Sequence, residues 1–255
     1  MQNNHNGSQT IAIVGATSLI AQHCARQWLQ AGGIGRMVLV GRDAARLQGV
    51  ADDLQVRQPQ ARIDVLAGDV TQAASIAALV QHLAAQGVPD VVLIAHGSLP
   101  DQSQCQNDLT SAEQAMAVNG LSPVLCAEAF AGAMLAAGHG TIGIIGSVAG
   151  DRGRKSNYVY GAAKGLVERY AEGLQHRLAG TAIKVVLVKP GPTDTPMTAH
   201  LKARGAKLAS VEQVAQAVVR GMARGTPVVY APAKWALIMA VIRNLPRAIF
   251  HKMDI

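Results

Sequence analysis

Aromatic and charged residues are scarce in this chain of 255 residues, at 3% and 15% of the total. Since 49% of the residues are hydrophobic, the core must consist mainly of Ala, Val, Leu and Ile. That composition suits a parallel sheet covered by helices on both faces. The lack of aromatics and the scattered positive charges argue against a nucleic-acid partner, despite a net charge of +7.

Cysteines are few as well, and Cys24, Cys105 and Cys126 are far apart and odd in number. They match no disulfide framework and no metal-ligand spacing, so we expect reduced, partly buried thiols and no metal site. No secretion signal opens the chain, and no apolar run is long enough to span a bilayer. We therefore expect a cytoplasmic protein with a disordered polar segment at residues 1–9 and one domain at residues 10–255.

Segments typical of strands and of helices alternate along the whole chain. The strand candidates are Thr10–Val14, Met37–Val40, Ile63–Ala67, Val91–Ala95, Thr141–Ile145, Lys184–Val188 and Pro227–Tyr230. The helical segments are Ile20–Ala31, Ala44–Gln58, Ala73–Gln86, Ser122–Ala137, Tyr158–Ala179 and Val211–Arg224. This alternation predicts right-handed βαβ units and a single α/β domain with a doubly wound, Rossmann-type parallel sheet. Two irregular stretches, Gly97–Leu109 and Gly191–Ala209, follow strand candidates and should overhang the ligand crevice.

The turn after the first strand has the character of a phosphate-binding loop. It contains Gly15, Thr17, Ser18, Leu19 and Ile20. A small residue lets the backbone approach a pyrophosphate, whose charge meets the amides of the helix N-terminus. With a single glycine, the segment also fits an ordinary tight turn between a strand and a helix.

The end of the second strand indicates which dinucleotide is bound. NAD enzymes usually carry an acidic residue there, whereas this chain has Arg42. A guanidinium fits the 2′-phosphate of NADP through charge-assisted hydrogen bonds, so we expect NADP rather than NAD. Asp43 follows, and it either caps the next helix or binds a ribose as in NAD enzymes.

The next two strand ends are candidates for further cofactor contacts. Asp69 and Val70 end the third strand, where an adenine ring would lie, although Asp69 also suits a helix cap. Ala95, His96 and Gly97 end the fourth strand and would let the cofactor pass close to the backbone. For His96 itself we favour a structural role.

Tyr160 and Lys164 are four positions apart on a predicted helix, so their side chains share one face. A neighbouring ammonium stabilises a phenolate and so eases proton transfer by a tyrosine. Ser147 follows the strand Thr141–Ile145, and Asn119 begins the long helix before it. The competing Tyr158 lies six residues before Lys164, on another face of the helix.

The set Asn119, Ser147, Tyr160 and Lys164, followed by Pro190-Gly191-Pro192-Thr193-Asp194-Thr195, resembles the short-chain dehydrogenase/reductase family from Thr10 to Tyr230. The resemblance implies that Tyr160 donates a proton to a carbonyl oxygen while hydride arrives from the nicotinamide. It further implies that Ser147 polarises that oxygen, that Lys164 binds the nicotinamide ribose, and that Asn119 positions a water linked to Lys164. It assigns the nicotinamide seat to Val188, Pro190, Gly191, Thr193 and Thr195. We also expect a small carbonyl or alcohol substrate and a homodimer or homotetramer.

The chain departs from the family pattern in two places, and other functions stay open. Leu19 and Ala21 replace two of the three usual glycines, and Ile94-Ala95-His96-Gly97 replaces the usual Asn-Asn-Ala-Gly. The first turn and the tail resemble bacterial reductases that act on lipid-linked keto-sugars. A catalytically idle nucleotide-binding regulator or scaffold would not need the four-residue set, and nucleotide-sugar epimerases usually have a larger C-terminal region.

The C-terminal tail, residues 234–255, combines apolar and basic residues. An apolar run at Trp235–Ile242 precedes Arg243, Arg247, His251 and Lys252, and Pro246 should break any helix. One interpretation is weak peripheral contact with the inner face of a membrane, with apolar side chains in lipid and basic ones at headgroups. The alternative is a terminal helix packed over the substrate pocket or a partner subunit.

Overall fold

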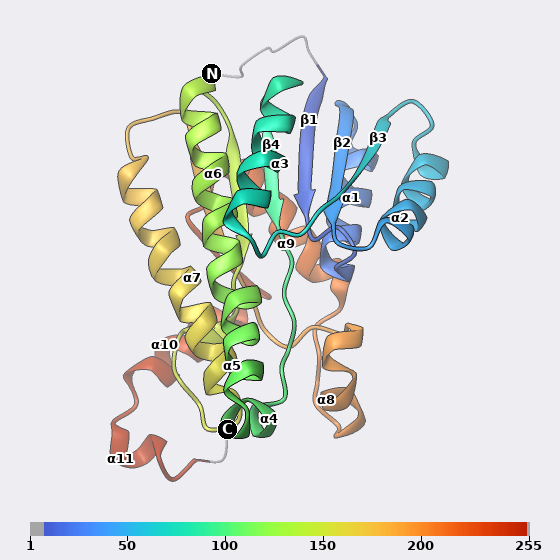
Figure 1. Ribbon diagram of the computed structural model, residues 1–255. Helices are drawn as coiled ribbons and strands as arrows, with labels where there is room; N and C mark the ends of the chain where they lie inside the picture. Colours follow the sequence, from blue (N-terminus) through green and yellow to red (C-terminus); the bar gives the residue numbers. More distant parts are fainter. Residues whose placement is uncertain (1–7, 254–255) are drawn as a thin grey trace.

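The computed structural model describes residues 8–253, which form a seven-stranded parallel sheet with helices on both faces (Figure 1). The strands are β1 (Gln9–Val14), β2 (Ile34–Gly41), β3 (Arg62–Ala67), β4 (Val91–Ile94), β5 (Thr141–Ile145), β6 (Lys184–Pro190) and β7 (Val228–Ala231). Their order is β3-β2-β1-β4-β5-β6-β7, so the winding reverses between β1 and β4. This reversal confirms the predicted single, doubly wound Rossmann-type domain and opens a crevice beyond the carboxyl ends of β1 and β4.

The helices fall into two layers and a group at the end of the sheet. One face carries α3 (Ala73–Ala85), α6 (Ser122–Ala137) and α7 (Tyr158–Arg177), and the other carries α1 (Leu19–Ala31), α2 (Ala44–Arg57) and α9 (Val211–Arg224). Beyond the carboxyl ends of the strands, low in Figure 1, lie α4 (Gln102–Asn107), α5 (Leu109–Met116), α8 (Ala199–Ala203), α10 (Lys234–Asn244) and α11 (Arg247–Phe250). Of this last group, α4 and α5 contribute residues to the crevice.

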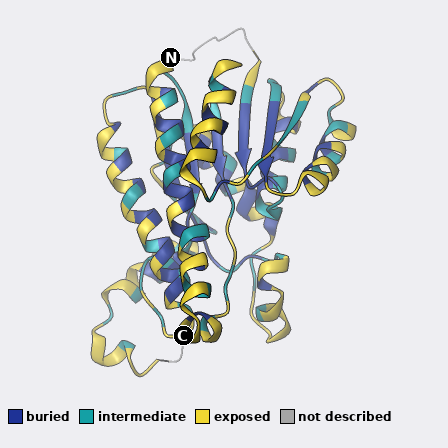
Figure 2. Ribbon diagram, in the orientation of Figure 1, coloured by how far each residue is buried: buried dark blue, intermediate teal, exposed yellow. Residues whose placement is uncertain are grey.

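The core is divided by the sheet into two apolar layers (Figure 2). Alternate residues of β1 contribute to each: Ala12 and Val14 to one layer, Ile11 and Ile13 to the other, and all four are fully buried. Because side chains alternate along a strand, a strand covered on both faces must be apolar throughout. The continuous apolar runs in the sequence are thus explained by this arrangement. Cys24, Cys105 and Cys126 are free and buried, as expected.

The loops beyond the strands are more regular than the sequence suggested. The stretch Gly97–Leu109 contains α4, which begins where Asp101 accepts a hydrogen bond from the Gln104 amide at 2.9 Å. The stretch Gly191–Ala209 contains a short 3-10 turn, Pro196–Thr198, and α8. The prediction of irregular loops was wrong there, and for α4 the physical reason is the capping side chain of Asp101. At the other end, Gln9 already belongs to β1, and residues 1–7 of the predicted disordered segment lie outside the described residues.

A continuous helix runs from Leu109 to Ala137 through α5, a π-helical turn (Ala117–Leu121) and α6. Within residues 8–253 it is the one helix long and apolar enough to cross a membrane, which contradicts the expectation that no segment would be. Half of the most apolar 18-residue stretch of this helix is buried, and Phe130 and Met134 lie fully buried in the core. Its apolar composition follows from packing against the sheet.

Candidate active site

A cleft of about 700 Å³ lies at the carboxyl ends of β1 and β4, where the winding reverses. Most of the predicted cofactor-binding residues line it: Gly15, Thr17, Ser18, Leu19, Ile20, Arg42, Val70, Ala95, His96, Gly97 and Thr195. The remaining ones are outside this lining: Asp69, Tyr160, Lys164, Pro190, Gly191 and Thr193. Folding thus gathers five separate segments of the chain, each following a strand, around one cavity.

Gly15 allows β1 and β4 to end side by side. Its φ is 84°, and a Cβ built there would lie 2.5 Å from the backbone nitrogen of His96. No side chain fits in that space, and the positive φ alone favours glycine. The single glycine of this turn is therefore required by its tight geometry, and the same geometry exposes backbone to the cleft.

The first turn of α1 faces the cleft through Ser18, Leu19 and Ile20. Ser18 is the N-cap residue but its side chain makes no capping hydrogen bond. The first amides of a helix have no partner within the helix, and the helix dipole places partial positive charge there. This turn is consequently suited to an anionic group such as a pyrophosphate.

Two arginines stand at the far end of the cleft. Arg42 follows β2 and Arg46 lies one turn into α2, and both line the cavity. Asp43 is committed to the helix cap, because its carboxylate accepts a hydrogen bond from the Arg46 amide at 3.0 Å. Of the two roles left open for Asp43, the structure therefore supports the cap. Sequence analysis missed Arg46, although its position four residues after Arg42 on a helix start could have indicated it.

Asp69 is turned towards its own loop. Its carboxylate accepts hydrogen bonds from the amide and the hydroxyl of Thr71, at 2.9 and 2.8 Å, which hold its pKa below the usual range. The neighbouring Val70 lines the cleft instead. Asp69 thus caps the turn before α3 rather than α3 itself, which begins at Ala73. At this position the apolar wall of the cleft comes from Val70.

His96 is half-buried at the cleft wall and makes structural contacts, in agreement with the sequence-based interpretation. Its Nε2 lies 2.7 Å from the Ser122 hydroxyl, which in turn donates to the Val70 carbonyl at 2.5 Å. This chain of contacts joins the end of β4, α6 and the loop after β3. Burial, together with a smaller contribution from the charge of Lys164, lowers the pKa of His96 to about 3. His96 is therefore neutral near neutral pH.

We expect this neutral histidine to make stability depend on pH. The unfolded chain binds a proton at His96 below about pH 6.5, whereas the folded chain does so only near pH 3. The free energy of unfolding should therefore decrease as the pH falls through this window, with a contribution approaching about 1.4 kcal/mol per pH unit. Chemical denaturation of wild type and His96→Asn at several pH values measures the difference. His139→Asn, at a half-exposed site, is the control, and equal slopes for His96→Asn and wild type would contradict the assignment.

The predicted catalytic residues lie next to Gly97, where the cleft meets α7. A Cβ built on Gly97 would stand 2.9 Å from Asn119 Oδ1 and 3.8 Å from Lys164 Nζ. Lys164 is buried, and its ammonium donates to the Ile145 carbonyl at 2.9 Å. Burial lowers the pKa of Lys164 to about 8. A cation is thus held beside the cleft without a carboxylate partner among the described residues.

Asn119 is fully buried within the π-helical turn rather than at a helix start, which corrects the sequence-based placement. Its Oδ1 accepts from the Ser98 amide and its Nδ2 donates to the Ala115 carbonyl, both at 2.9 Å. Its side chain therefore fixes the loop after β4 against the long helix. This loop is the one that carries Gly97 past Lys164.

Tyr160 lies between Ser147 and Lys164. The Lys164 ammonium is 5.8 Å from the centre of the Tyr160 ring. Burial raises the pKa of Tyr160, and a hydrogen bond with Ser147 partly counteracts the rise. The net direction is upward, so the phenol holds its proton at neutral pH. Tyr158, in contrast, is 45% exposed and points elsewhere.

Glycines bring α7 close enough to place these side chains. A Cβ on Gly150 would lie 2.8 Å from the Lys164 backbone, and one on Gly161 would lie 3.0 Å from the Ala149 carbonyl. Gly120 makes a similar close approach to Ala163. The backbones of α7, the turn after Ser147 and the π-helical turn consequently touch, which fixes the distances between the four predicted residues.

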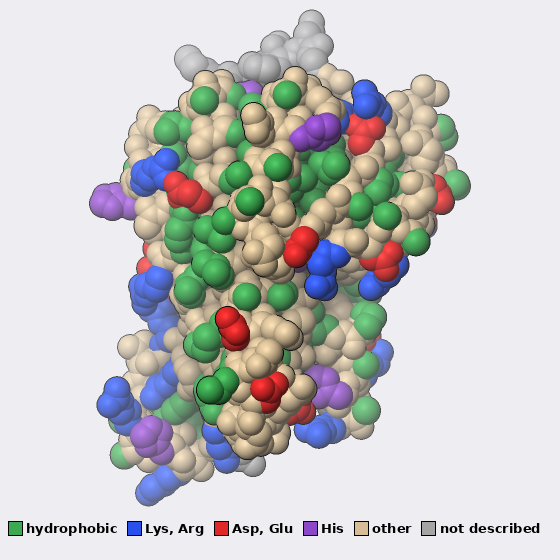
Figure 3. Space-filling view, in the orientation of Figure 1, with side chains coloured by type: hydrophobic (Ala, Val, Ile, Leu, Met, Phe, Trp, Pro, Cys, Tyr) green, Lys and Arg blue, Asp and Glu red, His purple; other side chains and the backbone are tan. Residues whose placement is uncertain are grey.

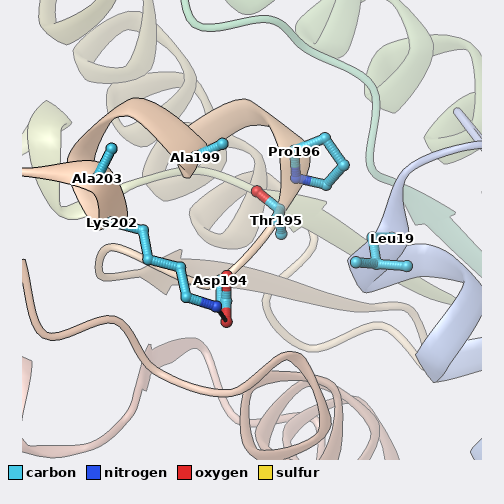
Figure 4. A pocket seen from close by; sticks show the side chains of 7 residues that line it. All are labelled: Leu19, Asp194, Thr195, Pro196, Ala199, Lys202 and Ala203. Atoms are coloured by element: carbon cyan, nitrogen blue, oxygen red, sulfur yellow. Dashed lines mark hydrogen bonds and ion pairs between the residues drawn. The ribbon is translucent and has the colours of Figure 1, made fainter.

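The segment after β6 closes one side of the cleft (Figure 4). Thr195 and Pro196 face Leu19 of α1 across a hollow of about 620 Å³, and Lys202 of α8 binds Asp194 at 2.6 Å. The buried Thr193 donates to the Gly191 carbonyl at 2.9 Å and so shapes the turn rather than facing a ligand.

Sequence analysis also missed a buried ionic cluster behind this segment. Lys189, just before Pro190, donates to Asp151 at 2.5 Å and to Glu168 at 2.7 Å, and Tyr230 donates to Asp151 at 3.2 Å. Burial lowers the pKa of Lys189, but these hydrogen bonds outweigh it and the net direction is upward. The cluster joins β6 to the loop after Ser147 and to α7. The presence of a lysine, Lys189, within an otherwise apolar strand could have indicated this cluster.

Comparison with known proteins assigns this arrangement to a family. The model of the short chain dehydrogenases matches residues 9–205. The chain belongs to the short-chain dehydrogenase family. This short-chain dehydrogenase is accordingly an oxidoreductase, as the residue pattern indicated.

Its relatives agree in length and fold. It is 32% identical over 250 residues to an uncharacterised oxidoreductase of Mycobacterium tuberculosis, covering 97% of this chain and 98% of the relative. An uncharacterised oxidoreductase of Streptomyces coelicolor is 29% identical, with 96% of each chain covered. A short-chain dehydrogenase from Sphingobium yanoikuyae, solved with NADPH, has a TM-score of 0.80 at 25% identity, covering 94% and 97% of the two chains. The narrower resemblance to reductases of lipid-linked keto-sugars is not borne out by these relatives.

Proposed function

We propose that this short-chain dehydrogenase is an NADP(H)-dependent enzyme that interconverts a ketone and a secondary alcohol, with Tyr160 as general acid and base. The observation that carries the proposal is the meeting of Ser147, Tyr160 and Lys164 beside the cleft. These residues come from the loop after β5 and from α7, and the close glycine contacts hold them in place.

The cleft fits NADP(H) at both ends. Arg42 and Arg46 offer cations to the 2′-phosphate, and the uncapped amides of α1 suit the pyrophosphate. Gly15 and Gly97 leave room for the cofactor to pass along the backbone. Bound there, NADP(H) would supply or accept the hydride. The NADPH found in the Sphingobium yanoikuyae dehydrogenase supports this choice.

The side chains at the reacting end divide the proton chemistry among them. Tyr160 donates its phenolic proton to the substrate oxygen during reduction, and its raised pKa keeps that proton on the phenol at neutral pH until the substrate is in place. The Ser147 oxygen accepts from the Ala149 amide at 3.1 Å, so its hydroxyl proton is available to the same substrate oxygen. The Lys164 ammonium stabilises the phenolate left on Tyr160.

We expect reduction to slow as the pH rises through about 8. Above this pH Lys164 loses the proton that stabilises the Tyr160 phenolate, since burial has lowered its pKa to about 8. The pH dependence of kcat/KM for ketone reduction measures the effect. Lys164→Arg keeps its charge, so the variant should retain its own, lower rate beyond pH 8. A wild-type profile that stays flat from about pH 7 to 9.5 would contradict the role of Lys164.

A substrate screen tests the proposed function directly. NADPH oxidation is followed with ketones of the steroid, acyl and keto-sugar classes, and NADP reduction with the corresponding secondary alcohols. We expect at least one class to give turnover that depends on both substrate and enzyme. Binding of NADPH without turnover on any class would instead favour a catalytically idle nucleotide-binding protein.

A further inference from the structure

The tail helix α10 is apolar on both of its sides. Met239 is buried and Trp235 packs so closely on Gly191 that a Cβ there would be 1.9 Å from its Nε1. On the opposite side Leu237 is 74% exposed and Val241 is 56% exposed. A helix that is apolar all round is normally covered all round. The outer face of α10 therefore lacks a partner within the described part of the chain.

This outer face is rigidly presented. The guanidinium of Arg152, in the loop after Ser147, donates to the Ile242 and Leu245 carbonyls at 2.5 and 2.7 Å. It also stacks on the Phe250 ring at 3.8 Å from the ring centre. One arginine thus satisfies the last carbonyls of α10 and holds α11 beside it. The surface exists before any partner binds.

The surroundings of the apolar face are cationic. Residues 234–255 contain four basic residues: Lys234, Arg243, Arg247 and Lys252. The sequence of this segment has a single acidic residue, Asp254. Lys and Arg side chains gather at the lower left of Figure 3, where Figure 1 places α10 and α11. We name α10 and α11 together the tail surface. Its charge suits an anionic partner.

A cavity of about 330 Å³ opens between the tail surface and the loop before α7. It is lined by Gly153, Arg154, Lys155, Tyr158, Phe250, His251 and Met253, with no carboxylate side chain among them. The Arg154 Nε is buried without a hydrogen-bond partner, and burial lowers the pKa of Arg154 although the charge of Asp151 opposes this. Asp151 is already bound to Lys189 at 2.5 Å. A phosphate in the cavity would give Arg154 the acceptor it lacks.

We propose that the tail surface docks on an anionic lipid surface, with Leu237, Val241 and Ile249 in contact with the acyl region and a lipid phosphate at Arg154. Ile249 of α11 is 53% exposed and extends the apolar face. A second copy of the chain on the same surface would bring like charges together, which disfavours self-association there. Apolar burial and charge attraction act together at a lipid surface.

Vesicle co-sedimentation of the full chain tests this docking. We expect binding to phosphatidylglycerol vesicles that weakens in added salt and is absent on phosphatidylcholine vesicles. Leu237→Asp should weaken binding about ten-fold or more, because it replaces an exposed apolar side chain that would enter the acyl region with a negative charge. Arg154→Gln should weaken vesicle binding roughly five-fold, because each cation near an anionic membrane surface contributes about 1 kcal/mol to the binding free energy. The matched controls are Val56→Asp, at an 82% exposed position on α2, and Arg169→Gln, at a 79% exposed position on α7.

Thermal unfolding and NADPH binding of each variant establish that it is folded. Failure of the wild type to bind phosphatidylglycerol at low salt would overturn the proposal. So would equal losses for Leu237→Asp and Val56→Asp. If sedimentation instead shows a dimer that Leu237→Asp dissociates, without vesicle binding by the wild type, a second copy of the chain covers this face and the lipid proposal is wrong.

Discussion

Tyr160→Phe is expected to lower kcat for ketone reduction about 100- to 10,000-fold, the usual contribution of a general acid. The substitution removes the phenolic proton donor and leaves the half-buried ring beside Lys164. NADPH binding should stay close to that of the wild type, because the cleft residues around Gly15 and Arg42 are untouched. Steady-state kinetics and a fluorescence titration with NADPH measure the two effects separately.

Tyr158→Phe is the matched control for that experiment. Tyr158 lies two residues away on the same helix, is 45% exposed and lines the Arg154 cavity rather than the cleft. Its variant should keep kcat within about two-fold of the wild type, since a surface hydroxyl is seldom worth more. Near-normal turnover by Tyr160→Phe, or an equal loss in both variants, would remove Tyr160 from the role of acid.

Arg42→Ala is expected to weaken NADPH binding about 10- to 100-fold and to leave NADH binding nearly unchanged. A hydrogen bond to a charged group contributes about 1.5–3 kcal/mol, and only NADPH carries the 2′-phosphate. Arg42 is exposed, and the carboxylate of the adjacent Asp43 is occupied by the Arg46 amide. Titrations with both cofactors give the ratio directly.

Arg46→Ala should show the same preference with a smaller loss, because Arg46 stands one turn further into α2 on the same cleft wall. Arg62→Ala, which removes a 68% exposed arginine from β3, should change neither affinity and controls for overall charge. Losses of equal size for NADPH and NADH in Arg42→Ala would show that the guanidinium does not bind the 2′-phosphate.

Much of the site could be predicted because its signals are local. Tyr160 and Lys164 share a helix face at a spacing of four residues, and Arg42 directly follows a strand, so both positions follow from chain geometry alone. Asp43 shows the limit of such reasoning. The sequence allowed it to cap α2 or to bind a ribose, and only the distance to the Arg46 amide decided between them.

By itself, the sequence determined the fold class and the alternation of the seven strands with the six main helices of residues 8–253, because apolar runs without alternation must be covered on both faces of a sheet. The tertiary structure alone decided the long-range contacts: Gly15 against His96, Lys189 between Asp151 and Glu168, and the tail on Gly191. Such contacts join residues dozens of positions apart, so no local pattern encodes them. Their geometry arises when the layers pack at full density and small residues let backbones touch.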